Sequence, residues 1–234
     1  MTGAKASLPD RLPRAVLFDW DNTLISNWRC VHSATNAALS AFGKPTVTLE
    51  DSYRQVRRSL RDSFPEIFGE DWPRAVEIFY RHFEANHLEE LEVLPGAESL
   101  LQALHEAGIY QGVVSNKTGR LLRKEAEALG WGRFFGRLVG ATDAATDKPT
   151  AAPVTLALEP ADLPEGAEVW FIGDADIDME CAHRSGCTPV LVGHTPVVHE
   201  GLDRFPPRYR FNDCVVVTDL VRRLADTISG NRNG

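Results

Sequence analysis

The sequence has 234 residues, of which 43% are hydrophobic and 25% are charged, values typical of a globular protein with one domain or two. Its 33 acidic residues outnumber the 25 basic ones, and the net charge of −8 argues against a surface for nucleic acid or anionic membranes. No apolar run is long enough to span a bilayer, so no membrane partner is expected.

The two ends of the chain and its cysteines carry few structural signals. Residues 1–14 lack the apolar segment of a secretory signal, and we expect them to be flexible, like residues 229–234. The cysteines are Cys30, Cys181, Cys187 and Cys214. They form no C-x-x-C pair and no cluster with histidines, which disfavours a disulfide framework or a zinc site. We therefore expect free thiols in a reducing cytoplasm.

The first predicted element is a buried strand at Ala15–Phe18, a short apolar run bounded by polar residues. Asp19 and Asp21 follow it, and side chains two residues apart in an extended chain point the same way. Two such carboxylates raise each other's pKa unless a cation lies between them. Because Asp and Asn are common in turns, a plain turn is the alternative interpretation of this stretch alone.

Residues 26–93 have helical periodicity and no convincing strand. We predict helices at Trp28–Phe42, from a capping-box-like start at Thr48, and at Gly69–Leu91. One face of the second helix carries Arg54, Arg57, Arg58 and Arg61. This small helical module is therefore inserted directly after the carboxylate pair, which makes it a candidate lid.

Strands and helices then alternate to the end of the chain. The predicted strands are Tyr110–Ser115, Phe134–Val139, Glu168–Ile172, Pro189–Val192 and Val215–Val217. The predicted helices are Pro95–Leu104, Leu121–Leu129, Pro149–Leu158, Asp176–Ser185 and Leu220–Ile228. Alternation of this kind is typical of βαβ units, so we predict a parallel sheet built from residues 15–25 and 94–228.

Polar residues follow several of these strands, and ligands of open α/β sheets bind at the carboxyl ends of strands. They are Asp19, Asp21, Ser115, Lys148, Asp174 and Asp178. The last two are about one helical turn apart and should face the same way. Each residue has an ordinary explanation as a helix cap, a strand-end cap or a surface lysine. Their recurrence along one sheet edge instead predicts a single site.

Four motifs in this order resemble those of haloacid dehalogenase superfamily hydrolases, in particular the phosphoglycolate phosphatase-like branch with a helical C1-type cap. They are Asp19-Trp20-Asp21-Asn22-Thr23, Ser115-Asn116-Lys117, Asp147-Lys148-Pro149 and Gly173-Asp174 followed by Asp178. The resemblance spans roughly residues 15–225. It implies an α/β fold with a Rossmann-like, doubly wound parallel sheet and an inserted all-helical cap. Asn22 stands where the family most often has glycine, but Asn tolerates positive φ, so the turn is expected to form.

The resemblance also implies an activity: a Mg²⁺-dependent phosphatase that hydrolyses a small, phosphoglycolate-like phosphate monoester. Asp19 would be the nucleophile and form an aspartyl-phosphate. Asp21 would protonate the leaving alcohol and then deprotonate the attacking water. Mg²⁺ would be held by Asp19, the main-chain carbonyl of Asp21 and Asp174, with support from Asp178.

The substrate would be held by further residues of the same motifs and of the helical module. Lys148 would neutralise Asp19 and a phosphate oxygen, while Ser115 and main-chain N–H groups near Asn22 and Asn116 would hold the phosphoryl group. Arg57 and Arg58 are suited to bind the far end of an anionic substrate, although arginine-rich helix faces are often only solvated. The expected partner is a small phosphate ester, bound by a monomer or homodimer.

There are four alternatives to this activity. A dehalogenase needs no second acid, so Asp21 argues against it. A phosphonate hydrolase wants a Schiff-base lysine in the cap, where Lys44 is the only lysine. A phosphomutase shares the whole core and stays open. A non-catalytic binding protein on this fold would have no reason to keep all the motif residues, and turnover of a chromogenic phosphate ester with Mg²⁺ would distinguish it from an enzyme.

Overall fold

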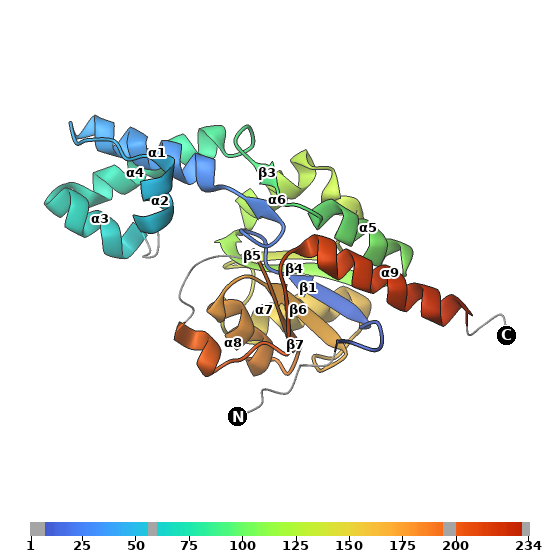
Figure 1. Ribbon diagram of the computed structural model, residues 1–234. Coiled ribbons are helices and arrows are strands. Elements are labelled where there is room, and N and C mark those ends of the chain that lie inside the picture. The colour runs from blue at the N-terminus through green and yellow to red at the C-terminus, as the bar shows by residue number, and fades with distance from the viewer. Residues whose placement is uncertain (1–7, 56–59, 194–199, 231–234) are drawn as a thin grey trace, which may run out of the picture. The chain divides into compact units, whose positions relative to one another are not determined.

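The computed structural model describes residues 8–55, 60–193 and 200–230 (Figure 1). The chain forms two compact units, which are described separately. The core unit comprises Met1–Ile25 and Val93–Gly234, and the inserted unit comprises Ser26–Glu92.

A six-stranded parallel sheet forms the centre of the core unit. Its spatial order is β5 (Arg137–Ala141), β4 (Tyr110–Thr118), β1 (Ala15–Phe18), β6 (Val169–Gly173), β7 (Thr188–Val192) and β8 (Tyr209–Phe211). The chain builds one side of β1 first and then crosses to the other, which is the strand order of the Rossmann fold. The order reverses between β1 and β6. Ligands of such sheets bind at this reversal, beyond the carboxyl ends of the strands.

Helices cover both faces of this sheet. They are α5 (Ala97–Glu106), α6 (Gly119–Ala128), α7 (Ala152–Leu158), α8 (Asp176–Arg184) and α9 (Cys214–Gly230). Figure 1 shows α5 and α9 on one face and α7 and α8 on the other. Alternate residues of β1 point to opposite faces, and Ala15 and Leu17 join the apolar cluster that includes Val154 of α7 and Ala182 of α8. The predicted doubly wound α/β fold is confirmed.

The inserted unit is helical, with an aromatic core. Its helices are α1 (Trp28–Ala41), α2 (Leu49–Gln55), α3 (Leu60–Phe68) and α4 (Trp72–Asn86). Phe64 of α3 packs edge-on against Phe79 of α4, with ring centroids 5.8 Å apart, and Phe79 stacks on Phe83. The predicted second helix of this region reaches only Gln55 before residues 56–59, which lie outside the described part.

The short elements complete the chain. They are the two-residue strands β2 (Ile25–Ser26) and β3 (Glu92–Val93), which pair with each other, and the 3₁₀ turns η1 (Gly69–Asp71), η2 (Trp131–Arg133), η3 (Glu159–Ala161) and η4 (Glu200–Asp203). Among the described residues, no helix is long and apolar enough to cross a membrane.

The predicted strand at Val215–Val217 is wrong, because these residues form the first turn of α9, and β8 is the sixth strand of the sheet. The run of β-branched residues favours a strand, but the Asp213 carboxylate accepts a hydrogen bond from the Val216 N–H at 3.0 Å and caps a helix. Val217 and Val221 are then buried one turn apart, whereas Val215 and Val216 are exposed. A helix therefore matches the spacing of the buried residues in this segment better than a strand would.

We expect Asp213→Ala to lower the free energy of unfolding by about 1 kcal/mol, because the N–H groups of the first turn of α9 lose a capping acceptor. Urea unfolding followed by circular dichroism measures the change. Asp226→Ala, an exposed position near the other end of α9, is the matched control and should change stability by less than about 0.5 kcal/mol. Equal effects of the two substitutions would contradict the capping role.

Candidate active site

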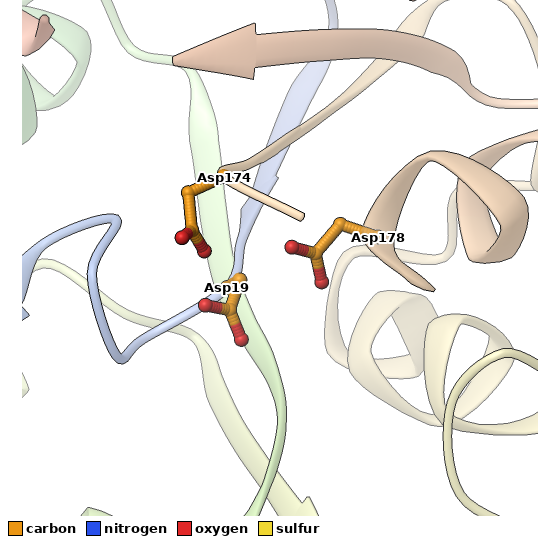
Figure 2. Close-up of side chains that lie close together, drawn as sticks. All are labelled: Asp19, Asp174 and Asp178. Carbon is orange, nitrogen blue, oxygen red and sulfur yellow. The ribbon is translucent and has the colours of Figure 1, made fainter. Parts of the chain in front are cut away.

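Three carboxylates meet where the strand order reverses. Asp19 follows β1 and Asp174 follows β6, and these strands are neighbours paired through Phe18 and Ile172. The Asp19 N–H extends the pairing by donating to the Ile172 carbonyl at 2.8 Å. Asp178 comes from the first turn of α8. Ligand oxygens of the three side chains lie within 4.8 Å of one another, and all three residues are buried (Figure 2). Three ligand oxygens this close together could hold a metal ion.

Gly173 allows Asp178 to approach this closely. A Cβ at Gly173 would lie 2.4 Å from the Asp178 Cβ and 2.5 Å from its Cγ, closer than carbon atoms can pack. The Ala175 N–H donates to Asp178 Oδ2 at 3.0 Å, which fixes the carboxylate at the start of α8. The site therefore requires glycine at position 173, because any side chain there would displace Asp178.

Lys148 places its ammonium between two of the carboxylates. Its Nζ donates to Asp19 Oδ1 at 2.6 Å and to Asp178 Oδ1 at 2.7 Å, and the lysine is itself buried. Asn116, at the end of β4, holds the main chain of this lysine on both sides. The Lys148 N–H donates to Asn116 Oδ1 at 3.0 Å, and Asn116 Nδ2 donates to the Lys148 carbonyl at 3.2 Å. The side chain of Asn116 therefore positions Lys148.

The turn after β1 orients Asp19 from the other side. Asn22 has a φ of +62°, the conformation expected of an Asn in the place of glycine, and its N–H donates to the Ile25 carbonyl at 2.7 Å. The Thr23 hydroxyl donates to Asp19 Oδ2 at 3.3 Å. Ser115 is buried at the end of β4, and its hydroxyl oxygen accepts the Lys117 N–H at 3.1 Å. The two carboxylate oxygens of Asp19 are therefore both hydrogen-bonded, Oδ1 to Lys148 and Oδ2 to Thr23.

Burial dominates the electrostatics of this cluster. It raises the pKa of Asp19 to about 7, with the Lys148 charge opposing and the Asp178 charge adding to the effect. It raises the pKa of Asp174 to about 8, with Asp19 and Asp178 adding. Burial lowers the pKa of Lys148, but the Asp178 and Asp19 charges outweigh it and hold that pKa well above its usual value. With all three carboxylates ionised, the one ammonium would leave a formal charge of −2, which a divalent cation would balance.

Comparison with known proteins agrees with this geometry. The family model of haloacid dehalogenase-like hydrolases matches residues 16–192.

The chain belongs to this family.

The resemblance predicted from the motifs is therefore confirmed. This hydrolase is 30% identical over 184 residues to a phosphoglycolate phosphatase of Xanthomonas campestris pv. campestris, covering 77% of this chain and 83% of the relative. It is 26% identical over 231 residues to a phosphoglycolate phosphatase of Pseudomonas savastanoi pv. phaseolicola, covering 94% and 82%. The crystal structure of a HAD-superfamily hydrolase from Ehrlichia chaffeensis is similar with a TM-score of 0.63 and 26% identity, covering 92% of this chain and 98% of that one.

The structure of the hydrolase adds three residues that sequence reasoning gave no role. Lys117 Nζ donates to Asp21 Oδ1 at 2.8 Å and to Glu125 Oε2 at 2.7 Å, and the Trp20 indole N–H donates to the same Glu125 oxygen at 2.7 Å. Glu125 lies between Leu122 and Ala126 on the buried face of α6. In the sequence, Glu125 stands at a position where the helical periodicity predicts an apolar residue. That departure was the signal from which a role for Glu125 could have been predicted.

The two arginines expected to bind substrate, Arg57 and Arg58, lie outside the described residues. The other predicted site residues of the hydrolase fall in the core unit. Asp19, Lys148, Asp174 and Asp178 form one cluster through direct contacts, and Asp21 is linked to Lys117.

We expect Mg²⁺ to bind the metal-free hydrolase more weakly at pH 6 than at pH 8, by about tenfold or more. Binding requires ionised carboxylates, and the pKa values of Asp19 and Asp174 are about 7 and about 8, so lowering the pH adds protons that compete with the ion. Isothermal titration calorimetry at both pH values measures this difference. Asp174→Asn should bind more weakly at pH 8 and show a smaller pH dependence. An affinity for Mg²⁺ that is constant between pH 6 and pH 8 would contradict binding of the ion by Asp19 and Asp174.

We expect Gly173→Ala to weaken Mg²⁺ binding by about tenfold or more, because the new methyl group displaces the Asp178 carboxylate. The matched control is Gly132→Ala, since a Cβ there meets no atom within 4 Å. The same titration at pH 8, with thermal unfolding measured in parallel, compares both variants. Wild-type affinity in Gly173→Ala would show that Mg²⁺ binding does not depend on the close approach of Asp178 to residue 173.

Proposed function

We propose that this hydrolase is a Mg²⁺-dependent phosphatase that cleaves a small, phosphoglycolate-like phosphate monoester through an aspartyl-phosphate on Asp19. The observation that carries the proposal is the cluster of Asp19, Asp174 and Asp178 around the Lys148 ammonium, at the reversal point of the sheet. The names of relatives at 26% and 30% identity support the phosphoglycolate-like substrate.

The donor set of the cluster fits Mg²⁺, which prefers carboxylate and carbonyl oxygens. Asp19 and Asp174 would be ligands together with the main-chain carbonyl of Asp21, and Asp178 would support them. Burial raises the pKa values of Asp19 and Asp174, as expected of groups arranged to receive a cation. When bound, the ion supplies positive charge that offsets the charge of the phosphate and polarises its oxygens.

The residues of the chain then divide the chemistry between them. A carboxylate oxygen of Asp19 attacks phosphorus, and the bond from phosphorus to the ester oxygen breaks. Asp21 gives its proton to the departing alkoxide. In the second half, Asp21 takes a proton from water, the water oxygen attacks the phosphorus of the aspartyl-phosphate, and inorganic phosphate leaves Asp19 free. Lys148 and Thr23 keep the Asp19 oxygens oriented throughout.

Other residues would hold the phosphoryl group and select the substrate. Ser115 and main-chain N–H groups near Asn22 and Asn116 would bind its oxygens, while Lys148 neutralises charge. The inserted unit would act as the cap: closing it would exclude water, and Arg57 or Arg58 would bind the far end of an anionic ester.

The setting of the reaction is part of the proposal. All four cysteines are free and buried, which supports a reducing cytoplasm as the location. We propose a monomer or homodimer as the active form.

The test is phosphate release from a panel of metabolite phosphates that includes phosphoglycolate, with and without Mg²⁺. We expect Mg²⁺-dependent release, and Asp19→Asn should lower kcat about a thousandfold or more because the nucleophile is lost. Mass spectrometry of the quenched wild type should find phosphate on Asp19. Asp219→Asn, exposed on α9, is the control.

Three results would contradict the proposal. Full activity in chelator would exclude the metal requirement, and Asp19→Asn activity within tenfold of wild type would exclude the nucleophile. Transfer of phosphate within or between sugar phosphates, without release, would identify a phosphomutase.

A further inference from the structure

A continuous chain of polar contacts connects the buried interior of α6 to Asp21. It runs from the Trp20 indole N–H to Glu125 Oε2 at 2.7 Å, from the same oxygen to Lys117 Nζ at 2.7 Å, and from Nζ to Asp21 Oδ1 at 2.8 Å. Trp20 comes from the turn after β1, Lys117 from the end of β4, and Glu125 from α6. The contacts therefore join three separate segments of the core unit.

The two ends of this chain differ in exposure. The Glu125 side chain is 0% exposed and that of Lys117 is 7% exposed, whereas that of Asp21 is 37% exposed. Trp20 is also buried and packs edge-on against Trp131, with ring centroids 5.8 Å apart. The buried end is thus held by packing, and the end that reaches solvent is the carboxylate of Asp21.

Stability alone gives no reason for a buried ion pair at this position. Removing a carboxylate and an ammonium from water is costly, and an apolar pair of similar volume is often at least as stable. Leu121, Leu122 and Ala126 already make this face of α6 apolar. An apolar pair could neither accept the buried Trp20 N–H nor present an ammonium to Asp21, and only the second of these contacts requires Lys117.

We propose that Lys117 is a positioning residue, anchored by Glu125 and Trp20, which holds the carboxyl group of Asp21 in the orientation for giving its proton to the departing alkoxide. The inference rests on the proposed phosphatase activity and deepens it. Lys117 does not exchange a proton with substrate in this scheme. It fixes the carboxyl group that does, by linking it to the Glu125 side chain of α6.

Leaving-group dependence distinguishes positioning of an acid from a general effect on folding. An alkoxide needs a proton to leave, whereas p-nitrophenolate leaves readily without one. We expect Lys117→Met to lower kcat/KM about 10-fold to 100-fold for the alkyl phosphate that the wild type hydrolyses fastest. It should change kcat/KM for p-nitrophenyl phosphate by less than about threefold. Asp21→Asn is the reference and should show the same selectivity more strongly.

Two further variants separate the role from stability. Lys117→Met leaves the Glu125 carboxylate buried without its ammonium, so the double variant Lys117→Met/Glu125→Gln removes that charge while the amide oxygen can still accept the Trp20 N–H. It should melt at a higher temperature than the single variant and keep the same alkyl-selective loss. Lys124→Met, an exposed lysine of α6, should leave both esters at wild-type rates.

The outcomes are distinct. An equal fall for alkyl and aryl esters, or no fall for either, would overturn the positioning role of Lys117. Recovery of the alkyl rate in the double variant, along with its melting temperature, would overturn it too. If the wild type hydrolyses no phosphate ester, the proposed function fails and this inference fails with it. If Asp21→Asn is selective and Lys117→Met is not, only this inference fails.

Discussion

Mutual repulsion among three buried carboxylates is the constraint on which the rest of the core unit depends. Asp19, Asp174 and Asp178 lie in a desolvated site, where the interaction between like charges is far stronger than in water. Buried carboxylates this close together must therefore be paired with a cation or take up protons. Lys148 removes part of this repulsion by binding two of the three, and the negative charge that remains is what would attract a cation.

The neighbours of the cluster have roles that follow from this constraint. Asn116 holds the main chain of Lys148, so that a long and flexible side chain starts from a fixed point. Gly173 leaves the space in which the Asp178 carboxylate lies. Each of these residues comes from a different strand end or connecting loop. The site therefore exists only when β4, β1 and β6 lie side by side and the loop after β5 brings Lys148 to them.

Sequence patterns predict the elements whose apolar residues recur at a regular spacing. They do not predict features that depend on contacts between residues far apart in the sequence. Apolar runs and helical periodicity predict most of the core strands and helices, because burial on both faces of a parallel sheet leaves a strong signal. The residues of the carboxylate cluster are also visible, since polar side chains at successive strand ends are unusual. By contrast, Val215–Val217 have the composition of a strand, and only the Asp213 cap and burial along one helix face decide otherwise. The pairing of Trp20 with Glu125 joins residues 105 positions apart, and no local pattern could predict it.

The position of the inserted unit has a consequence for how the chain is made. β1 is synthesised before both of its neighbours in the sheet, since Ala15 pairs with Tyr110 on one side and Val169 on the other. The helical unit, a continuous segment from Ser26 to Glu92, can complete its contacts long before β1 has a partner. Contacts so far apart in sequence form slowly, because a long loop must close before they can stabilise anything. β1, the strand that presents Asp19, is therefore synthesised before the helical unit but enclosed after it, and its apolar residues lack their sheet partners until β4 and β6 have been made.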